Sequence, residues 1–399
     1  MRRAALALIM AACLPAGISG IPGAAAPVPA GGDIVIGQTA PYSGPASAYS
    51  SIGKASAAYF DMINDTGGIA GHKIRFIALD DGYNPARTVE LTRKLVEQEN
   101  VLVMFDSIGT PTNAAVRKYL NDRGVPQLFV GSGATQWGDP AHYPWSMGWQ
   151  PSYGAEARVF AAYIKANLPA AKVAILYQND DYGKDYIAGL RAVFGVDYDK
   201  RVVATASYEP TDATVDSQIV SLAASGAGAF VNITSPKFAA QAIRKAYDIG
   251  WHPTQFLNSV STGVAAVLTP AGLEKSVGLI APGYFKDPTD PQFKGDKGVA
   301  EYAAWAAKYP PGSRPQELFA VYGYSVAQTM VQVLRQAGGD LTRANVLKQA
   351  TDLKGLALPM LMPGITIDTS KTEYYPIHRM RLQRFDGTRW VPFGPVIEG

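Results

Sequence analysis

Cysteine is almost absent from this chain, which has 399 residues and a single thiol, Cys13. One thiol cannot form an intramolecular disulfide, so a disulfide-stapled scaffold is excluded. The fold must be held by burial of apolar side chains, and 47% of the residues are hydrophobic. A chain of this length can bury a sufficient core, in more than one domain.

Long hydrophobic runs and clusters of one charge are also missing after residue 31. No stretch there approaches the ~20 consecutive apolar residues of a transmembrane helix. The 36 basic and 33 acidic residues are spread evenly and give a net charge of +3. Without a basic stripe, nucleic-acid binding has little support, and we expect no nucleic-acid partner.

The motifs of enzyme chemistry are missing too, including the G-x-S-x-G elbow, the P-loop and G-x-G-x-x-G. The histidines are scattered without metal-ligand spacing, at positions 72, 142, 252 and 378. The acidic pairs Asp80-Asp81 and Asp180-Asp181 stand at predicted strand ends, but adjacent strand residues point to opposite faces. We therefore predict turn or helix-start roles for these acids, no cofactor or metal, and no enzymatic activity.

The first thirty residues have the composition of a secretory signal peptide. Arg2 and Arg3 precede a short apolar run, and small residues lead to Ala30, where we expect cleavage. Cys13, in "MAAC", leaves a lipoprotein signal as the alternative. The sequence predicts a signal peptide over 1–30 and a soluble product in a bacterial periplasm.

From Asp33 onward, strand, loop and helix patterns alternate. Apolar strands are predicted at 33–39, 73–82, 101–107 and 126–135. A helix with Ile52, Ala55, Tyr59 and Met62 on one side follows the first strand. Asn84 is the expected cap of the next helix, with Pro85 at its first position. Such alternation predicts a mainly parallel sheet with helices on both faces.

The pattern restarts after a crossover rich in proline, glycine and tryptophan at 142–154. Strand–loop–helix units recur at 172–195 and 228–250, with strands at 254–263 and 277–287 and a long helix at 317–339. Short strands are expected at 362–368 and around the Asp-Gly turn of 380–393. The sequence thus predicts an α/β protein with two sheet-based lobes.

Loops after the predicted strands are rich in serine, threonine, glycine and tyrosine. In open α/β sheets, ligands bind beyond the carboxyl ends of the strands. The loops "SIGT" (107–110) and "GSGAT" (131–135) each lie between a strand and a predicted helix. Free N–H groups at a helix start, with neighbouring hydroxyls, can bind an anion without a formal positive charge. We expect these two loops to hold a ligand carboxylate.

The segment 37–101, "GQTAPYSGPASAYSS…VEQENV", resembles the opening of the periplasmic amino-acid-binding proteins of the leucine/isoleucine/valine type. The resemblance continues through "GVPQLFVGSGAT", "YQNDDYGKD" and "YGYSVAQTMVQVLRQAG" and covers nearly all of 33–355. It implies the type I periplasmic-binding fold, in which two doubly wound Rossmann-like lobes joined by a three-segment hinge close on a ligand. We place lobe 1 at 31–150 and 283–356, and lobe 2 at 151–282 and 357–399.

The resemblance also implies a role in transport and a set of ligand contacts. Members of this family are receptors of ABC importers, so we expect a monomer that delivers a small molecule to an inner-membrane permease. The positions that match the family's ligand-binding loops are Tyr49, Gly109, Thr110, Ser132, Gly133, Thr135, Tyr182, Ser235 and Ser259.

One departure from the family bears on the ligand. Amino-acid binders have an acidic residue that meets the ligand's ammonium, whereas the matching stretch here, 257–263, has no carboxylate. A buried ammonium without a countercharge is costly. We therefore expect a small carboxylate with an aromatic or branched apolar body. An α-amino acid is the alternative ligand, because Asp180 and Asp181 could supply the charge. A ligand sensor and an exported enzyme also stay open as classes of function.

Overall fold

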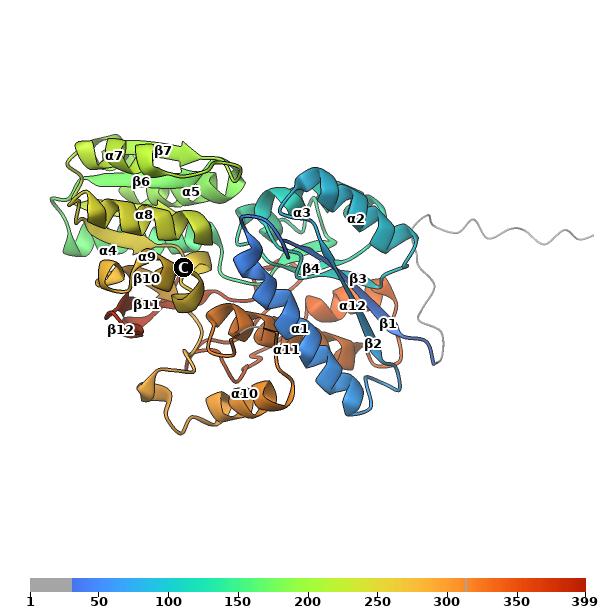
Figure 1. Cartoon of the computed structure of the whole chain (residues 1–399). Coiled ribbons are helices and arrows are strands. Elements are labelled where there is room, and N and C mark those ends of the chain that lie inside the picture. Colours follow the sequence, from blue (N-terminus) through green and yellow to red (C-terminus); the bar gives the residue numbers. More distant parts are fainter. Residues whose placement is uncertain (1–30, 313) are drawn as a thin grey trace, which may run out of the picture.

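The computed structural model describes residues 31–312 and 314–399, which form two α/β lobes (Figure 1). The predicted signal peptide, residues 1–30 with Cys13, lies outside these residues. The first sheet is all parallel, in the order β2-β1-β3-β4-β5. Its strands are β1 (Ile34–Ala40), β2 (Ile74–Asp80), β3 (Val103–Phe105), β4 (Gln127–Val130) and β5 (Ser146–Gly148).

Helices from both halves of the described chain flank the first sheet. They are α1 (Ser50–Asp65), α2 (Pro85–Glu97), α3 (Thr110–Asp122), α10 (Lys297–Lys308), α11 (Leu318–Ala337) and α12 (Arg343–Ala350). The predicted cap of α2 is confirmed, since the Asn84 side chain accepts from the N–H groups of Ala86 and Arg87. Helices α1 and α11 pack closely, because a Cβ at Gly323 would lie 2.1 Å from the Ile52 carbonyl oxygen.

The second sheet has the order β12-β11-β10-β9-β8-β6-β7. Its strands are β6 (Val173–Gln178), β7 (Val202–Tyr208), β8 (Ala229–Ile233), β9 (Thr254–Leu257), β10 (Ile280–Gly283), β11 (Arg379–Phe385) and β12 (Trp390–Glu398). β6 to β10 pair in parallel, and β11 and β12 are antiparallel additions at one edge. The helices of this lobe are α4 (Tyr153–Asn167), α5 (Asp181–Phe194), α6 (Tyr198–Arg201), α7 (Asp216–Ala224), α8 (Pro236–Asp248) and α9 (Thr269–Ala271).

The predicted hairpin around Asp386-Gly387 is present as β11 and β12, whereas the strand predicted at 362–368 is wrong. That segment makes only an isolated bridge, between Leu356 and Ile367. Its apolar residues, including Met362 and Ile365, are buried in the core of the first lobe. The apolar residues of this segment therefore belong to a loop that is inserted into a core.

The described chain passes between the two lobes three times: between β5 and β6, after β10, and before β11. Residues on either side of these crossings are Trp149 and Tyr153, Ile280 and Tyr284, and Ile377 and Met380, and one member of each pair is buried in the main core of each lobe. The predicted fold class, two doubly wound lobes joined by three segments, is thereby confirmed. The exact lobe boundaries stay a prediction, and the burial of 358–377 in the first core leads us to propose the last boundary between Ile377 and Met380.

Membrane insertion finds no support in the part of the chain that the structure describes. None of its helices is long and apolar enough to cross a bilayer.

Candidate ligand-binding cleft

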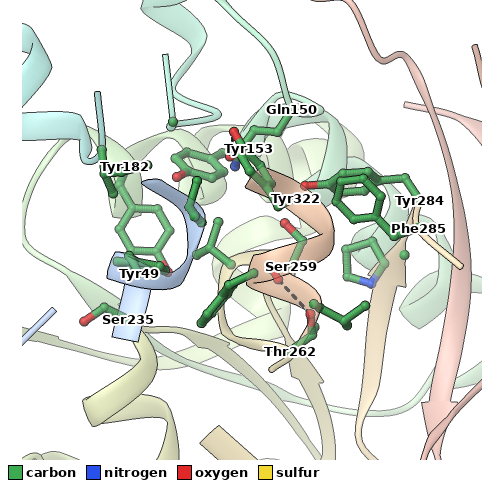
Figure 2. Close-up of a pocket in the computed structure, with 18 of the residues that line it drawn as sticks. Tyr49, Gln150, Tyr153, Tyr182, Ser235, Ser259, Thr262, Tyr284, Phe285 and Tyr322 are labelled. Atoms are coloured by element: carbon green, nitrogen blue, oxygen red, sulfur yellow. Dashed lines mark hydrogen bonds between the residues drawn. The ribbon is translucent and has the colours of Figure 1, made fainter. Parts of the chain in front are cut away.

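A cavity lies between the two lobes, beyond the carboxyl ends of strands from both sheets (Figure 2). Its empty volume is ≈ 890 Å³, including the part open to solvent. Figure 2 shows Tyr49, Tyr182 and Ser235 at one side and Tyr284 and Phe285 at the other. We call these the α3 end and the crossover end.

The two ends of the cavity are defined by the segments that form them. The α3 end includes Gly109 and Thr110 at the start of α3, and the crossover end includes the lining residues of the segment 284–287, which follows β10. Gly109 lies against Tyr83, and a Cβ on Gly109 would come within 2.6 Å of the Tyr83 ring.

Aromatic side chains form most of the wall. They are Tyr49, Tyr83, Tyr153, Tyr182, Tyr284, Phe285, Phe319, Tyr322 and Trp390. Their rings pack against one another, with centroids 4.8 Å apart for Tyr153 and Tyr182 and 4.5 Å apart for Tyr284 and Phe285. Burial raises the pKa of the Tyr182 and Tyr322 phenols, so these hydroxyls are neutral at physiological pH.

Polar groups of the lining are almost all neutral. No lysine, arginine or histidine lines the cavity within the described residues. Two lining atoms, Tyr182 Oη and Gln150 Nε2, are buried and have no hydrogen-bond partner in that same part of the chain. Buried polar groups are normally paired, so unpaired donors at a cavity wall mark places where a ligand can bind.

The start of α3 supplies further donors at the α3 end. Gly109 precedes the helix with φ of 109°, a backbone conformation that favours glycine. The side-chain amide of Asn113 donates to the carbonyls of Ser107 (2.8 Å) and Gly109 (2.7 Å) and so fixes this loop. Because first-turn N–H groups of a helix lack intrahelical partners, the Thr110 end of α3 can accept an anion.

Six of the nine predicted site residues line the cavity, namely Tyr49, Gly109, Thr110, Tyr182, Ser235 and Ser259. Ser132, Gly133 and Thr135 do not. Ser132 lies behind Thr110, with their hydroxyl oxygens 2.7 Å apart. The Gly133 carbonyl accepts from the N–H of Tyr153 (2.7 Å). The structure thus brings six of the predicted residues together at the cavity, and of the "GSGAT" loop only Gly131 lines it.

The "GSGAT" loop does hold a carboxylate, but one from the chain itself. The N–H of Thr135 donates to Oδ2 of Asp185, on α5, at 2.5 Å. Thr135 is exposed and starts only a four-residue 3₁₀ helix, Thr135–Gly138. Burial raises the pKa of Asp185, and the hydrogen bonds from Thr135 oppose that rise. The Thr135 end of this loop therefore links the two lobes, whereas Gly131 at its start lines the cavity.

Sequence reasoning missed Glu156, which lies on α4 behind the cavity wall. Its carboxyl accepts from the N–H of Ser259 (3.1 Å) and from the hydroxyls of Ser259 and Tyr186. Glu156 is fully buried, and burial raises its pKa to about 7 against the effect of these hydrogen bonds. The sequence did contain a signal for it: Glu156 is the one acid on the buried, apolar side of α4, which also carries Phe160 and Ile164.

The sequence analysis also did not predict the residues of the crossover end, although they too follow the carboxyl end of a parallel strand. Tyr284, Phe285 and Asp287 follow β10, a parallel strand. Asp287 is 8% exposed, and its Oδ1 accepts from the N–H and hydroxyl of Thr289, both at 2.7 Å. Burial raises the pKa of Asp287.

The acidic pairs have structural roles. Asp180 caps α5 and accepts from the N–H groups of Tyr182 and Gly183. Asp81 accepts from the Thr88 hydroxyl at 2.8 Å. Across 31–312 and 314–399, no three His, Cys, Asp or Glu side chains gather in a way that could hold a metal ion.

Comparison with known proteins agrees with the fold. The family model described as "Periplasmic binding protein" matches residues 33–389. The "Leu/Ile/Val-binding protein homolog 7" of Brucella abortus is 24% identical over 334 residues, which cover 78% of this chain and 79% of that protein.

Solved structures share the architecture at low sequence identity. A branched-chain amino acid ABC transporter protein from Thermus thermophilus, with bound valine, has a TM-score of 0.82 at 18% identity, covering 92% of this chain and 97% of that one. A fatty acid ABC transporter substrate-binding protein from Thermomonospora curvata has a TM-score of 0.74 at 19% identity, with 92% of each chain covered. Because the family model matches residues 33–389, the chain belongs to the periplasmic binding protein family.

Proposed function

We propose that this protein is the extracytoplasmic receptor of an ABC importer, and that its cleft binds a small carboxylate with an aromatic or branched apolar body. The observation that carries this proposal is the start of α3, where Gly109 and Thr110 face the cavity and no cation stands among the described lining residues. The protein would act as a monomer in the periplasm and present its ligand-bound form to a membrane permease.

The carboxylate end of the ligand is expected at the α3 end. The Thr110 N–H and the unpaired Tyr182 Oη can donate there, and the Thr110 hydroxyl can also donate when Ser132 supplies the proton of the hydrogen bond between the two hydroxyls. A hydrogen bond to a charged group is worth about 1.5–3 kcal/mol. Several such bonds can replace an arginine while still allowing the ligand to leave.

The body of the ligand would lie along the aromatic wall. Tyr153, Phe319 and Tyr322 provide large apolar surfaces with fixed ring orientations. Each favourable aromatic pair contributes about 0.5–1.5 kcal/mol beyond area burial. An aromatic or branched body would use this wall fully.

Binding is coupled to the hinge because the ligand contacts come from both lobes. Tyr49 and Thr110 belong to the first lobe, and Tyr182, Ser235 and Ser259 to the second. A ligand that contacts both lobes favours the conformation in which they approach each other. A permease can then distinguish loaded from empty receptor by shape.

An α-amino acid is the second candidate, and Glu156 favours it. The loop 257–263 lacks an acid, yet the Glu156 carboxyl lies directly behind Ser259, which lines the cavity. It could stabilise an ammonium through the Ser259 hydroxyl. The names of the relatives, which include Leu/Ile/Val-binding proteins, point the same way.

A thermal-shift screen followed by calorimetry tests both candidates. The panel would contain aromatic acids such as 3-phenylpropionate, branched acids such as isovalerate, and the amino acids leucine, valine and phenylalanine. A ligand at 100 times its Kd stabilises the fold by about 2.7 kcal/mol, which raises the melting temperature measurably. A shift with simple acids supports the first candidate, and a shift with amino acids alone supports the second. No shift with any carboxylate, or conversion of a panel compound to a product, would contradict the proposal.

A further inference from the structure

A carboxyl group lines the cavity at its crossover end, and only half of it is engaged. Oδ1 of Asp287 accepts two hydrogen bonds from Thr289. No hydrogen bond within the described residues involves Oδ2 of Asp287. A carboxyl oxygen of a cavity-lining residue that has no partner from the chain can accept a hydrogen bond from water or from a ligand that displaces the water.

The cations nearest in sequence and space are engaged elsewhere. Arg389 pairs with Asp290 (2.6 Å) and lies 3.5 Å from Asp386. Lys286 Nζ donates to both oxygens of Asp296, at 2.8 and 2.9 Å. Asp290 raises the pKa of Asp287 further, and Arg389 lowers it only as a minor effect. Neither of these two cations therefore pairs with the Asp287 carboxylate.

The position of Asp287 relative to the start of α3 is the second observation. Figure 2 shows Phe285, two residues before Asp287, on the side of the cavity opposite Tyr49 and Tyr182. Ser259 and Thr262 lie between the two sides in that view. A ligand whose carboxylate lies at the α3 end would therefore extend its other end toward the segment 284–287, of which Asp287 is the acidic lining residue.

We infer that the ligand carries a hydroxyl or amino group at the end remote from its carboxylate, and that Asp287 accepts a hydrogen bond from it. This inference rests on the proposed function, because it takes the carboxylate to lie at Thr110. The substrate class becomes an elongated acid with a terminal donor, such as a para-hydroxylated or para-aminated aryl acid. An unsubstituted aryl acid would leave the Asp287 oxygen without a partner.

The test uses matched ligand pairs in calorimetry: 3-(4-hydroxyphenyl)propionate against 3-phenylpropionate, and 4-(aminomethyl)benzoate against 4-methylbenzoate. The wild-type protein should bind the donor-bearing member of at least one pair tenfold or more tightly. Asp287→Ala should reduce that preference to less than threefold while binding of the donor-free member stays within threefold of wild type. Asp199→Ala, which removes an exposed acid of the second lobe that does not line the cavity, is the matched control and should retain the full preference.

The outcomes separate the inference from the proposed function. Equal affinity of wild-type protein for both members of both pairs would overturn the inference and leave the carboxylate receptor standing. A preference that persists in Asp287→Ala would assign the donor to another residue and also overturn it. Failure of every carboxylate to bind would overturn the proposed function and the inference with it. If Asp287→Ala does not fold, Asp287→Asn should lose the preference for the aminomethyl compound, because the charge is removed while the shape is kept.

Discussion

The loops 107–110 and 131–135 have similar composition and both follow a parallel strand, yet they make different contacts. The first starts a 13-residue helix and faces the cavity. The second starts a short 3₁₀ helix, and its Thr135 N–H is bound by Asp185. The difference comes from Asp185, a side chain of the second lobe. Its carboxylate binds the loop 131–135, whereas the loop 107–110 is left to bind the carboxylate of a ligand.

The Ser259 loop resembles the "GSGAT" loop in this respect. Its N–H and hydroxyl are bound by the Glu156 carboxyl, although Ser259 still lines the cavity. Two loops at the lobe junction are therefore satisfied internally, and the α3 loop is left for a ligand anion. Substitutions that act on one loop at a time test whether the α3 loop and the "GSGAT" loop differ in ligand binding.

The largest effect is expected from Gly109→Val. The residue has φ of 109°, and its added Cβ would lie 2.6 Å from both the Tyr83 ring and the Thr112 hydroxyl oxygen. We expect ligand affinity to fall by about 100-fold or more, equivalent to ~2.7 kcal/mol, with a lower melting temperature. Gly339→Ala, where a Cβ meets nothing within 4 Å in the described chain, is the control. Unchanged affinity in calorimetry would remove the α3 loop from the site.

The Glu156 carboxyl should make stability depend on pH. Its pKa is about 7 in the folded protein against 4.5 for an ordinary glutamate, so between these values the folded state binds the proton that the unfolded state has lost. Stability should therefore fall as pH rises from about 5 to about 8, by on the order of 2–3 kcal/mol. Glu156→Gln should flatten this part of the profile in thermal unfolding, and an unchanged slope would show that Glu156 is ionised throughout.

A direct contrast comes from Thr110→Val and Thr135→Val, which remove one hydroxyl from each loop. Thr110→Val should weaken ligand binding about tenfold, or ~1.4 kcal/mol, because Thr110 lines the cavity and its hydroxyl, 2.7 Å from that of Ser132, belongs to the hydrogen-bonded start of α3. Thr135→Val should change affinity less than twofold, because Thr135 is exposed and bonded to Asp185 through its N–H. Equal losses in the two variants would restore the "GSGAT" loop to the ligand site.

The smallest effect is expected from Asp185→Ala. The substitution leaves the Thr135 N–H to water, at a cost of about 0.5–1.5 kcal/mol in stability and little change in affinity. Asp181→Ala, an exposed acid on the same helix, should leave the melting temperature unchanged. A large loss of ligand affinity in Asp185→Ala alone would mean that the lobe junction, and not the cavity, limits binding.

Local features of this fold could be predicted from the sequence, because their causes lie within a few residues. Asn84 caps the helix that it precedes, and Gly109 and Thr110 stand where a strand gives way to a helix. Contacts between distant segments could not be predicted. Asp185 reaches Thr135 across 50 residues, and Glu156 reaches Ser259 across 103. No local pattern at either loop signals that its anion site is already filled.

The three segments that connect the two lobes constrain how the lobes can move. A single connection would allow the lobes to twist as well as to bend relative to each other. Three connections resist the twist and favour hinge bending about one axis. Tyr182 and Ser259 would then meet Thr110 in the same register at each approach. Lengthening one crossing, such as the stretch from Ile377 to Met380, should therefore disturb ligand selectivity without touching a single residue of the cavity.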